Sequence, residues 1–185
     1  MKLNPRLDIG SERHAQEIAS HGLRWIDYVD MPEEEERVHM AEAVSWHTTL
    51  TGSRPLGWYT GRNSTNTRRL AVEEGGFLYD ADSYSDDLPY YEAVNGAPHL
   101  VVPYTFDVND QKFASPNSFD TGEEFLTYLK ETFDALYAEG GGSDGEPKMM
   151  SVGLHCRLAG RPARAAAVAK FVDYMLEHER VRRYH

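Results

Sequence analysis

Two histidines in this chain stand where a side chain could take part in chemistry. His21 follows the stretch 17–20, which has strand character, and His155 follows the apolar run 149–154. A rigid strand aims the side chain at its end, and the loop beyond it leaves room for a substrate. An imidazole can exchange a proton near neutral pH because its reference pKa is about 6.5. For both residues the alternative is a purely structural histidine.

Arginine, aspartate and tryptophan side chains near other predicted strand ends extend the candidate site. A guanidinium presents several donors in a fixed plane, so Arg62 and Arg157 suit a substrate rich in carbonyl oxygens. Arg157 could equally pair with the many carboxylates of this acidic chain. Trp25 and Trp58 could wall a flat pocket, or they could simply pack in the core. Asp80 could orient a catalytic group or cap a turn.

The elements that would position these residues alternate between strand and helix. Start signals and apolar periodicity predict helices over 30–50, 65–75 and 122–138, from Pro162 onward and, less regularly, from about residue 11. Apolar runs predict strands at 54–60, 77–79, 100–104 and 149–154, with a loop at 83–97 and polar residues at 107–110. This order predicts one α/β domain over 1–185, with a parallel sheet whose active face lies at the carboxyl ends of the strands.

Helix caps and core faces follow from the same patterns. Asp30 and Thr121 are the expected N-caps. The acidic run 33–36 is expected to be solvated at the positive end of the helix dipole. The expected core positions, helix by helix, are Val38, Ala41, Ala43 and Val44; Phe125, Leu129, Phe133 and Leu136; and Val168, Phe171, Val172 and Met175.

Composition narrows the possible partners. The net charge is −11, which disfavours binding to the phosphates of a nucleic acid. No apolar run approaches membrane-spanning length, and residues 1–13 lack the apolar stretch of a signal peptide. The single cysteine, Cys156, fits a reducing compartment such as the cytoplasm. It should point away from His155, because neighbours on a strand face opposite sides. We therefore expect a small-molecule substrate, with neither nucleic acid nor membrane as a partner.

Four stretches resemble the signatures of the NodB-like polysaccharide deacetylase superfamily, and they occur in the family's order between about residues 17 and 179. Glu-Ile-Ala-Ser-His at 17–21 resembles the second signature. Arg54-Pro-Leu-Gly resembles the third, whose arginine orients a catalytic carboxylate, and Asp80 resembles the aspartate of the fourth. Leu154-His155 resembles the last, whose histidine is the general acid. The resemblance implies a distorted (β/α) barrel with parallel strands.

The resemblance also bears on the metal site. In the family, two histidines four residues apart and an early aspartate hold a metal ion. Here the position four residues after His21 is Trp25, which cannot ligate a metal. The resemblance therefore implies no metal and no other cofactor. The run His-Gly-Leu-Arg-Trp-Ile-Asp-Tyr at 21–28 is instead similar to the metal-independent allantoinase branch, as are the stretches 57–62 and 153–162.

That branch implies a hydrolase that opens a cyclic amide, most simply allantoin to allantoate in purine catabolism. The implied roles are proton donation to the departing ring nitrogen by His155, polarisation of the carbonyl or water by His21, orientation of catalytic groups by Arg54 and Asp80, and substrate binding by Arg62, Arg157, Trp25 and Trp58. The general base is left unassigned. Related imidases would use the same parts, so the identity of the amide stays open.

Two alternatives remain at this stage. One is a metal-dependent N-deacetylase of chitin or peptidoglycan, which is the commonest activity of the superfamily. The other is an inactive remnant or interaction module, because the first signature is missing and family members are longer at their N-terminus. A barrel without its opening βα units would have exposed sheet edges. We therefore expect the chain to be a homo-oligomer.

Overall fold

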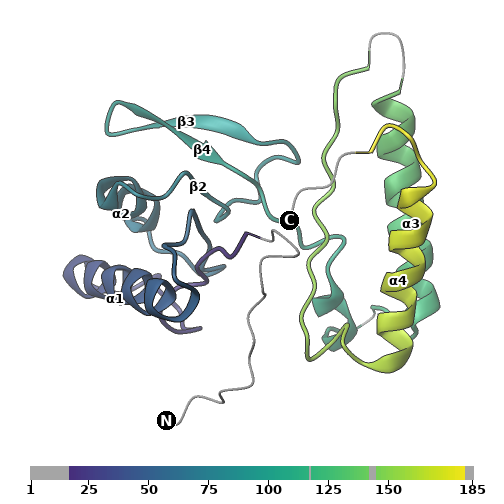
Figure 1. Cartoon of the computed structure of the whole chain (residues 1–185), viewed down its shortest axis with the longest axis horizontal. Helices are drawn as coiled ribbons and strands as arrows, with labels where there is room; N and C mark the ends of the chain where they lie inside the picture. Colours follow the sequence, from purple (N-terminus) through teal and green to yellow (C-terminus); the bar gives the residue numbers. More distant parts are fainter. Residues whose placement is uncertain (1–16, 117, 142–144, 182–185) are drawn as a thin grey trace. The chain divides into compact units, whose positions relative to one another are not determined.

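The computed structural model describes residues 17–116, 118–141 and 145–181. These residues form two compact units (Figure 1). The first unit contains residues 17–82 and Tyr90–Val102, and the second contains Ser83–Pro89 and the described residues from Pro103 onward. The helix predicted from residue 11 lies outside the described residues.

The first unit combines two helices with a four-stranded sheet. Its elements are α1 (Glu33–Thr51), β1 (Gly57–Trp58), α2 (Thr67–Glu74), β2 (Tyr79–Asp80), β3 (Tyr90–Val94) and β4 (Ala97–Val101). The strand order is β1-β2-β4-β3, and β1, β2 and β4 are parallel. A parallel bridge between Ser20 and Trp58 extends the sheet beyond β1. The α/β class with a mostly parallel sheet is thus confirmed, although the strands are shorter than predicted.

The segment 83–97 is only partly the loop that the sequence suggested. Its second half forms β3, which pairs antiparallel with β4 from Tyr90↔Val101 to Val94↔Ala97. Asn95 and Gly96 connect the two strands with positive φ values of 52° and 79°. Asn-Gly favours this two-residue turn because both residues tolerate positive φ, and the turn's twist matches that of the flanking strands.

The core of the first unit lies between the two helices and the sheet. Its buried apolar residues are Met40, Ala43, Trp58, Leu70, Ala71 and Phe77. Val38 is 54% exposed and Ala41 is also exposed, so the predicted face of α1 is wrong for these two residues. Helix α1 has Pro32 at its N-cap without a side-chain cap bond, whereas Asp30 was expected there.

Glu36 contradicts the expectation that the acidic run is solvated. Its side chain is 1% exposed. Its carboxylate accepts hydrogen bonds from the Ser64 hydroxyl, at 2.6 Å, and from the Thr67 hydroxyl. The pattern of α1 brings Glu36 to the inward face one turn before Met40, and the two hydroxyls compensate for part of its lost hydration.

We expect Glu36→Ala to lower the free energy of unfolding by about 1–3 kcal/mol, because both buried hydroxyls would lose their acceptor. The matched control is Glu35→Ala, an exposed residue of the same helix turn, with an expected change below about 1 kcal/mol. Urea denaturation of the two variants measures the difference. Equal effects would show that the buried hydrogen bonds of Glu36 contribute nothing.

The second unit is built on two helices, α3 (Gly122–Glu139) and α4 (Pro162–Leu176), which lie alongside each other (Figure 1). A short 3₁₀ helix, η1 (Asp110–Ala114), precedes them. The buried core consists of Val108, Phe125, Leu126, Leu129, Phe133, Ala167 and Phe171. Thr121 caps α3 as predicted, and it forms a full capping box with Glu124.

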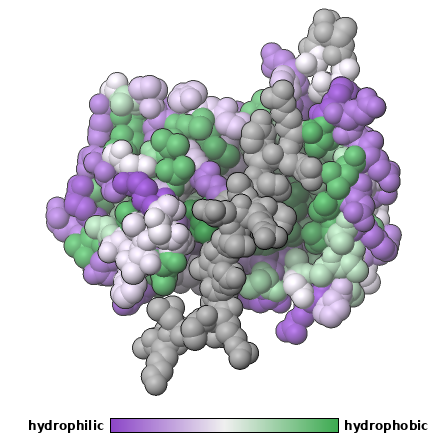
Figure 2. All heavy atoms as spheres, viewed as in Figure 1, coloured by the Kyte–Doolittle hydropathy of each residue, from purple (hydrophilic) through white to green (hydrophobic). Residues whose placement is uncertain are grey.

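Two details of the second unit differ from the predictions. The apolar run 149–154 does not form a continuous strand. It contributes a single parallel bridge from Gly153 to Asn109. On α4, Val172 is 37% exposed and Leu176 is 52% exposed, and Figure 2 shows hydrophobic residues on the visible surface of this helix. Among the described residues, no helix is long and apolar enough to cross a bilayer.

Candidate active site

His155 is held by a buried carboxylate. Its Nδ1 lies 2.6 Å from Oδ1 of Asp110, which is 0% exposed, while the His155 side chain itself is 26% exposed. The other Asp110 oxygen accepts hydrogen bonds from the backbone N–H groups of His155 and Ala159, at 2.7 and 2.9 Å. Because Asp110 occupies Nδ1, the Nε2 atom is the one left to exchange a proton with a substrate.

The bridge between Asn109 and Gly153 sets up this pair. Asp110 N–H donates to the Gly153 carbonyl and Gly153 N–H donates to the Val108 carbonyl, at 2.9 and 3.0 Å. The backbone at Gly153 approaches the Asn109 side chain so closely that a Cβ there would lie 2.4 Å from Asn109 Nδ2. The glycine therefore permits the approach that brings Asp110 beside His155.

The predicted position of His21 at the end of an extended segment is seen in the first unit. Ser20 N–H donates to the Gly57 carbonyl and Tyr59 N–H donates to the Ser20 carbonyl, both at 2.9 Å. His21 follows immediately and is exposed. Its ring meets the edge of the Tyr59 ring at a centroid distance of 5.0 Å and an angle of 71°. The imidazole is thus placed next to the loop that follows β1.

Trp25 and Arg62 form a stacked pair beyond the same strand ends. The guanidinium carbon of Arg62 lies 4.4 Å from the centroid of the Trp25 ring. The indole is 65% exposed, and Arg62 is exposed as well. A cation over an indole face is attracted by the ring quadrupole and is held flat against it. Two of the four residues predicted to bind substrate therefore form one surface.

Asp80 is paired with an arginine, but not with the one that the sequence suggested. Arg68 of α2 contacts both carboxylate oxygens, at 2.8 and 3.1 Å, and His99 Nε2 lies 3.0 Å from Oδ2. Asp80 is 1% exposed. These contacts raise the pKa of Arg68 further above its usual range, chiefly through the hydrogen bond to Asp80. A carboxylate so enclosed is a fixed hydrogen-bond acceptor for Arg68 and His99.

Arg54 lies at the other end of the parallel strands. It precedes β1, pairs with Glu74 at 2.6 Å and packs over Phe77 and against Gly76, just before β2. Asp80 stands at the carboxyl end of β2, so the arginine that pairs with it is Arg68 and not Arg54. The sequence could not reveal this pairing, because Arg54 and Arg68 both precede Asp80 and their spacing does not show which of them reaches it.

Asp82 is a further residue that sequence reasoning did not single out. Its carboxylate accepts hydrogen bonds from the N–H and hydroxyl groups of Thr60 and from the N–H of Gly61, at 2.7–3.0 Å. Burial raises the pKa of Asp82, while these donors act in the opposite direction. Asp82 thus anchors the loop that leaves β1.

Two other predicted residues differ in how well they suit their assigned roles. Trp58 is 1% exposed and packs against Phe77 in the core, so its ring has no surface to offer a substrate. Arg157 is exposed, and its nearest described side-chain partner is Gln111, at 3.5 Å. An exposed guanidinium two residues after His155 is compatible with substrate binding.

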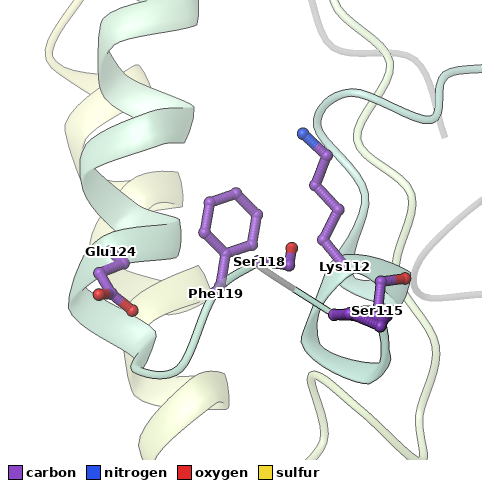
Figure 3. A pocket seen from close by; sticks show the side chains of 6 residues that line it. Lys112, Ser115, Ser118, Phe119 and Glu124 are labelled. Carbon is purple, nitrogen blue, oxygen red and sulfur yellow. The ribbon is translucent and has the colours of Figure 1, made fainter.

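The predicted residues fall into two groups. The first unit holds His21, Trp25, Arg62 and Asp80 near the carboxyl ends of its strands, with Arg54 at the opposite ends. The second unit holds His155 and Arg157. An open hollow in the second unit lies elsewhere, beside η1 and the start of α3. Figure 3 shows it lined by Lys112, Ser115, Ser118, Phe119 and Glu124, none of which was a predicted site residue.

The donor set around His21 does not fit the metal site that the superfamily implies. The position of the second histidine is occupied by Trp25, whose indole stacks on Arg62. Over the described ranges, no group of three or more His, Cys, Asp or Glu side chains is arranged to hold a metal ion. We therefore assign no chemical step to a metal.

Comparison with known proteins finds relatives among polysaccharide deacetylases and an allantoinase. No family model matches the chain. A Schizosaccharomyces pombe protein named "Putative polysaccharide deacetylase" is 39% identical to it over 194 residues, covering 96% of this chain and 60% of that protein. Crystal structures of PuuE allantoinase and of a probable polysaccharide deacetylase from Pseudomonas aeruginosa PAO1 share 59% and 56% identity. Each match has a TM-score of 0.85 and covers 90% of this chain and 55% of the chain in that crystal structure.

The chain is similar over almost its whole length to proteins named polysaccharide deacetylase and allantoinase, and the predicted NodB-like fold is confirmed over the matched part. A structure from Mycobacterium smegmatis, at 24% identity and a TM-score of 0.77, shows the same fold. The chain spans 60% of the length of the curated relative and 55% of the two more similar structures.

The Arg68–Asp80 pair gives a test of the first unit. We expect Arg68→Met to lower the free energy of unfolding by about 3–5 kcal/mol, because it leaves the buried Asp80 carboxylate without its main partner. Arg69→Met is the matched control. It breaks the pairs with Glu33 and Glu73, which are all partly exposed, and should cost less than about 1 kcal/mol. Chemical denaturation compares them, and similar losses would contradict a central role for Arg68.

Proposed function

We propose that this chain is the larger part of a metal-independent hydrolase that opens a cyclic amide, with allantoin as the first candidate substrate and allantoate as its product. The observation that carries the proposal is the His155–Asp110 pair, which leaves one imidazole nitrogen available at the end of a bridge. The resemblance of the chain to the allantoinase branch and its 59% identity to PuuE allantoinase support this choice of substrate.

The proposed chemistry assigns a proton transfer to His155. Hydrolysis of a ring amide requires addition of water to the carbonyl, stabilisation of the oxyanion and protonation of the departing nitrogen. His155 Nε2 supplies that proton, while Asp110 fixes the ring and stabilises the imidazolium form before transfer. We assign no general base to the described residues, since Asp80 is enclosed by Arg68 and His99.

The remaining residues bind and polarise the substrate. His21 polarises the carbonyl or the water, and the Arg62 and Arg157 guanidinium groups bind substrate oxygens through their fixed, planar donors. Trp25 backs Arg62. A hydantoin ring with a ureido arm presents several carbonyl oxygens and a flat face, which suits the guanidinium and indole of Arg62 and Trp25.

The competing function is N-deacetylation of a polysaccharide, in keeping with the names of two relatives. Trp25 at the second ligand position argues against the metal-dependent version of that reaction. An assay should therefore offer allantoin, hydantoin, succinimide and an acetylated chitin oligomer, each with and without chelator. We expect ring opening that is insensitive to chelator. Activity on the oligomer alone, or activity abolished by chelator, would overturn the proposal.

His155→Ala should lower kcat for ring opening by about 10²–10⁴-fold, the usual cost of losing a general acid. The rate is measured with this 185-residue chain and with a version extended to the length of its relatives. A loss smaller than tenfold would remove His155 from its assigned role.

Asp110→Asn should lower kcat by at least about tenfold with little change in KM, because the imidazole would lose the carboxylate that orients it. The matched control is Asp107→Asn. Asp107 is exposed, lies three residues earlier and contacts Lys112 and Tyr128 instead. Steady-state kinetics distinguishes the two variants, with circular dichroism to verify that both are folded. Equal kinetics would argue against the pair.

A further inference from the structure

The Asp82 carboxylate accepts several hydrogen bonds from the loop that follows β1. Both of its oxygens face the Thr60–Gly61 peptide, and they accept from two successive backbone N–H groups and from the Thr60 hydroxyl. The Thr60 side chain is 3% exposed. Asp82 is itself held, because its N–H donates to Asp80 Oδ1 at 3.0 Å. The bound loop is thus linked to the Asp80–Arg68 pair.

The Thr60–Gly61 peptide that Asp82 holds lies directly before Arg62. Gly61 has a φ of 73°, in the left-handed region that favours glycine, so the chain changes direction there. Immediately after this change, the Arg62 carbonyl accepts a hydrogen bond from Tyr28 N–H at 3.0 Å, and its guanidinium stacks on Trp25. The direction in which Arg62 leaves the loop therefore depends on the conformation that Asp82 holds.

Tyr59, which precedes this peptide, is held by the backbone of the sheet. Its N–H donates to the Ser20 carbonyl as part of the bridge that extends the sheet. The contact between Tyr59 and His21 is therefore supported by the sheet itself. Loss of the Asp82 hydrogen bonds should disturb Arg62 more than His21.

We propose that Asp82 is a positioning residue that sets substrate affinity by holding the Thr60–Gly61 peptide and so presenting the Arg62 guanidinium, over the Trp25 ring, to the carbonyl oxygens of a planar substrate. This inference rests on the proposed function. An arginine that is already immobilised on an indole loses less side-chain entropy when it binds, so its donors contribute more to affinity. Asp82 acts through Arg62 and does not itself touch the substrate.

Steady-state kinetics on the full-length protein tests the direction of the effect. Asp82→Asn keeps the size of the side chain but places an amide N–H₂ against backbone N–H donors. We expect KM for allantoin to rise about tenfold, equivalent to about 1.4 kcal/mol, while kcat changes less than about threefold. Asp86→Asn is the matched control, because Asp86 also accepts from two successive N–H groups, those of Asp87 and Leu88, but is exposed. Its kinetics should be unchanged.

A double-mutant cycle with Arg62→Ala separates positioning from a general loss of structure. If Asp82 acts through Arg62, Asp82→Asn should change KM less than about twofold once Arg62 is absent. Effects of the two substitutions that simply multiply, or a fall in kcat as large as the rise in KM, would overturn the proposal.

Hydrogen exchange gives a readout that needs no substrate. In Asp82→Asn, the amide protons of Thr60, Gly61 and Tyr28 should exchange at least about tenfold faster, while that of Tyr59 stays protected by Ser20. Unchanged exchange of the three amides would show that Asp82 does not hold the Thr60–Gly61 peptide. If exchange is faster but the protein opens none of the cyclic amides, Asp82 does hold the Thr60–Gly61 peptide and the proposed function is rejected.

Discussion

The hydrogen bonds of one carboxylate, that of Asp110, determine the arrangement of the second unit's candidate site. A fully buried carboxylate is costly unless donors surround it, and Asp110 meets three of them: the imidazole of His155, the backbone of the same residue, and the backbone of Ala159. The segment 155–159 must therefore fold around this single side chain. A histidine with a defined orientation is a consequence of that requirement, whatever reaction it serves.

The first unit applies the same principle with other donors. Asp80 is enclosed by an arginine and a histidine, Asp82 by two backbone N–H groups and a hydroxyl, and Glu36 by two hydroxyls. Each of these carboxylates joins segments that are distant in sequence. In a chain with a net charge of −11, the buried acids serve as connections between loops and helices, and the repulsion among the remaining acids falls mainly on the surface.

Local signals in the sequence predicted the helices among the described residues well, but the bounds of the strands poorly. Thr121 and Glu124 define a capping box within four residues, and His21 and His155 follow extended segments that the apolar pattern marks. The partners of those residues were harder to predict, because Asp110 is 45 residues from His155 and reaches it only through the Asn109–Gly153 bridge. Glu36 and Arg68 were missed for a related reason, since a charged residue indicates solvent unless its buried partners are known. The Asn95–Gly96 turn was available in the sequence, but the surrounding Asp, Pro and Tyr residues favoured a loop.

The distribution of tryptophan has a spectroscopic consequence. All three tryptophans, Trp25, Trp46 and Trp58, lie in the first unit, with exposures of 65%, 54% and 1%. Indole fluorescence excited at the red edge therefore reports on that unit alone, and mainly Trp58 will shift its emission when the core opens. The second unit is rich in tyrosine and phenylalanine, and its helices dominate its far-ultraviolet signal. Unfolding curves recorded by the two signals will coincide only if both units unfold in a single cooperative transition.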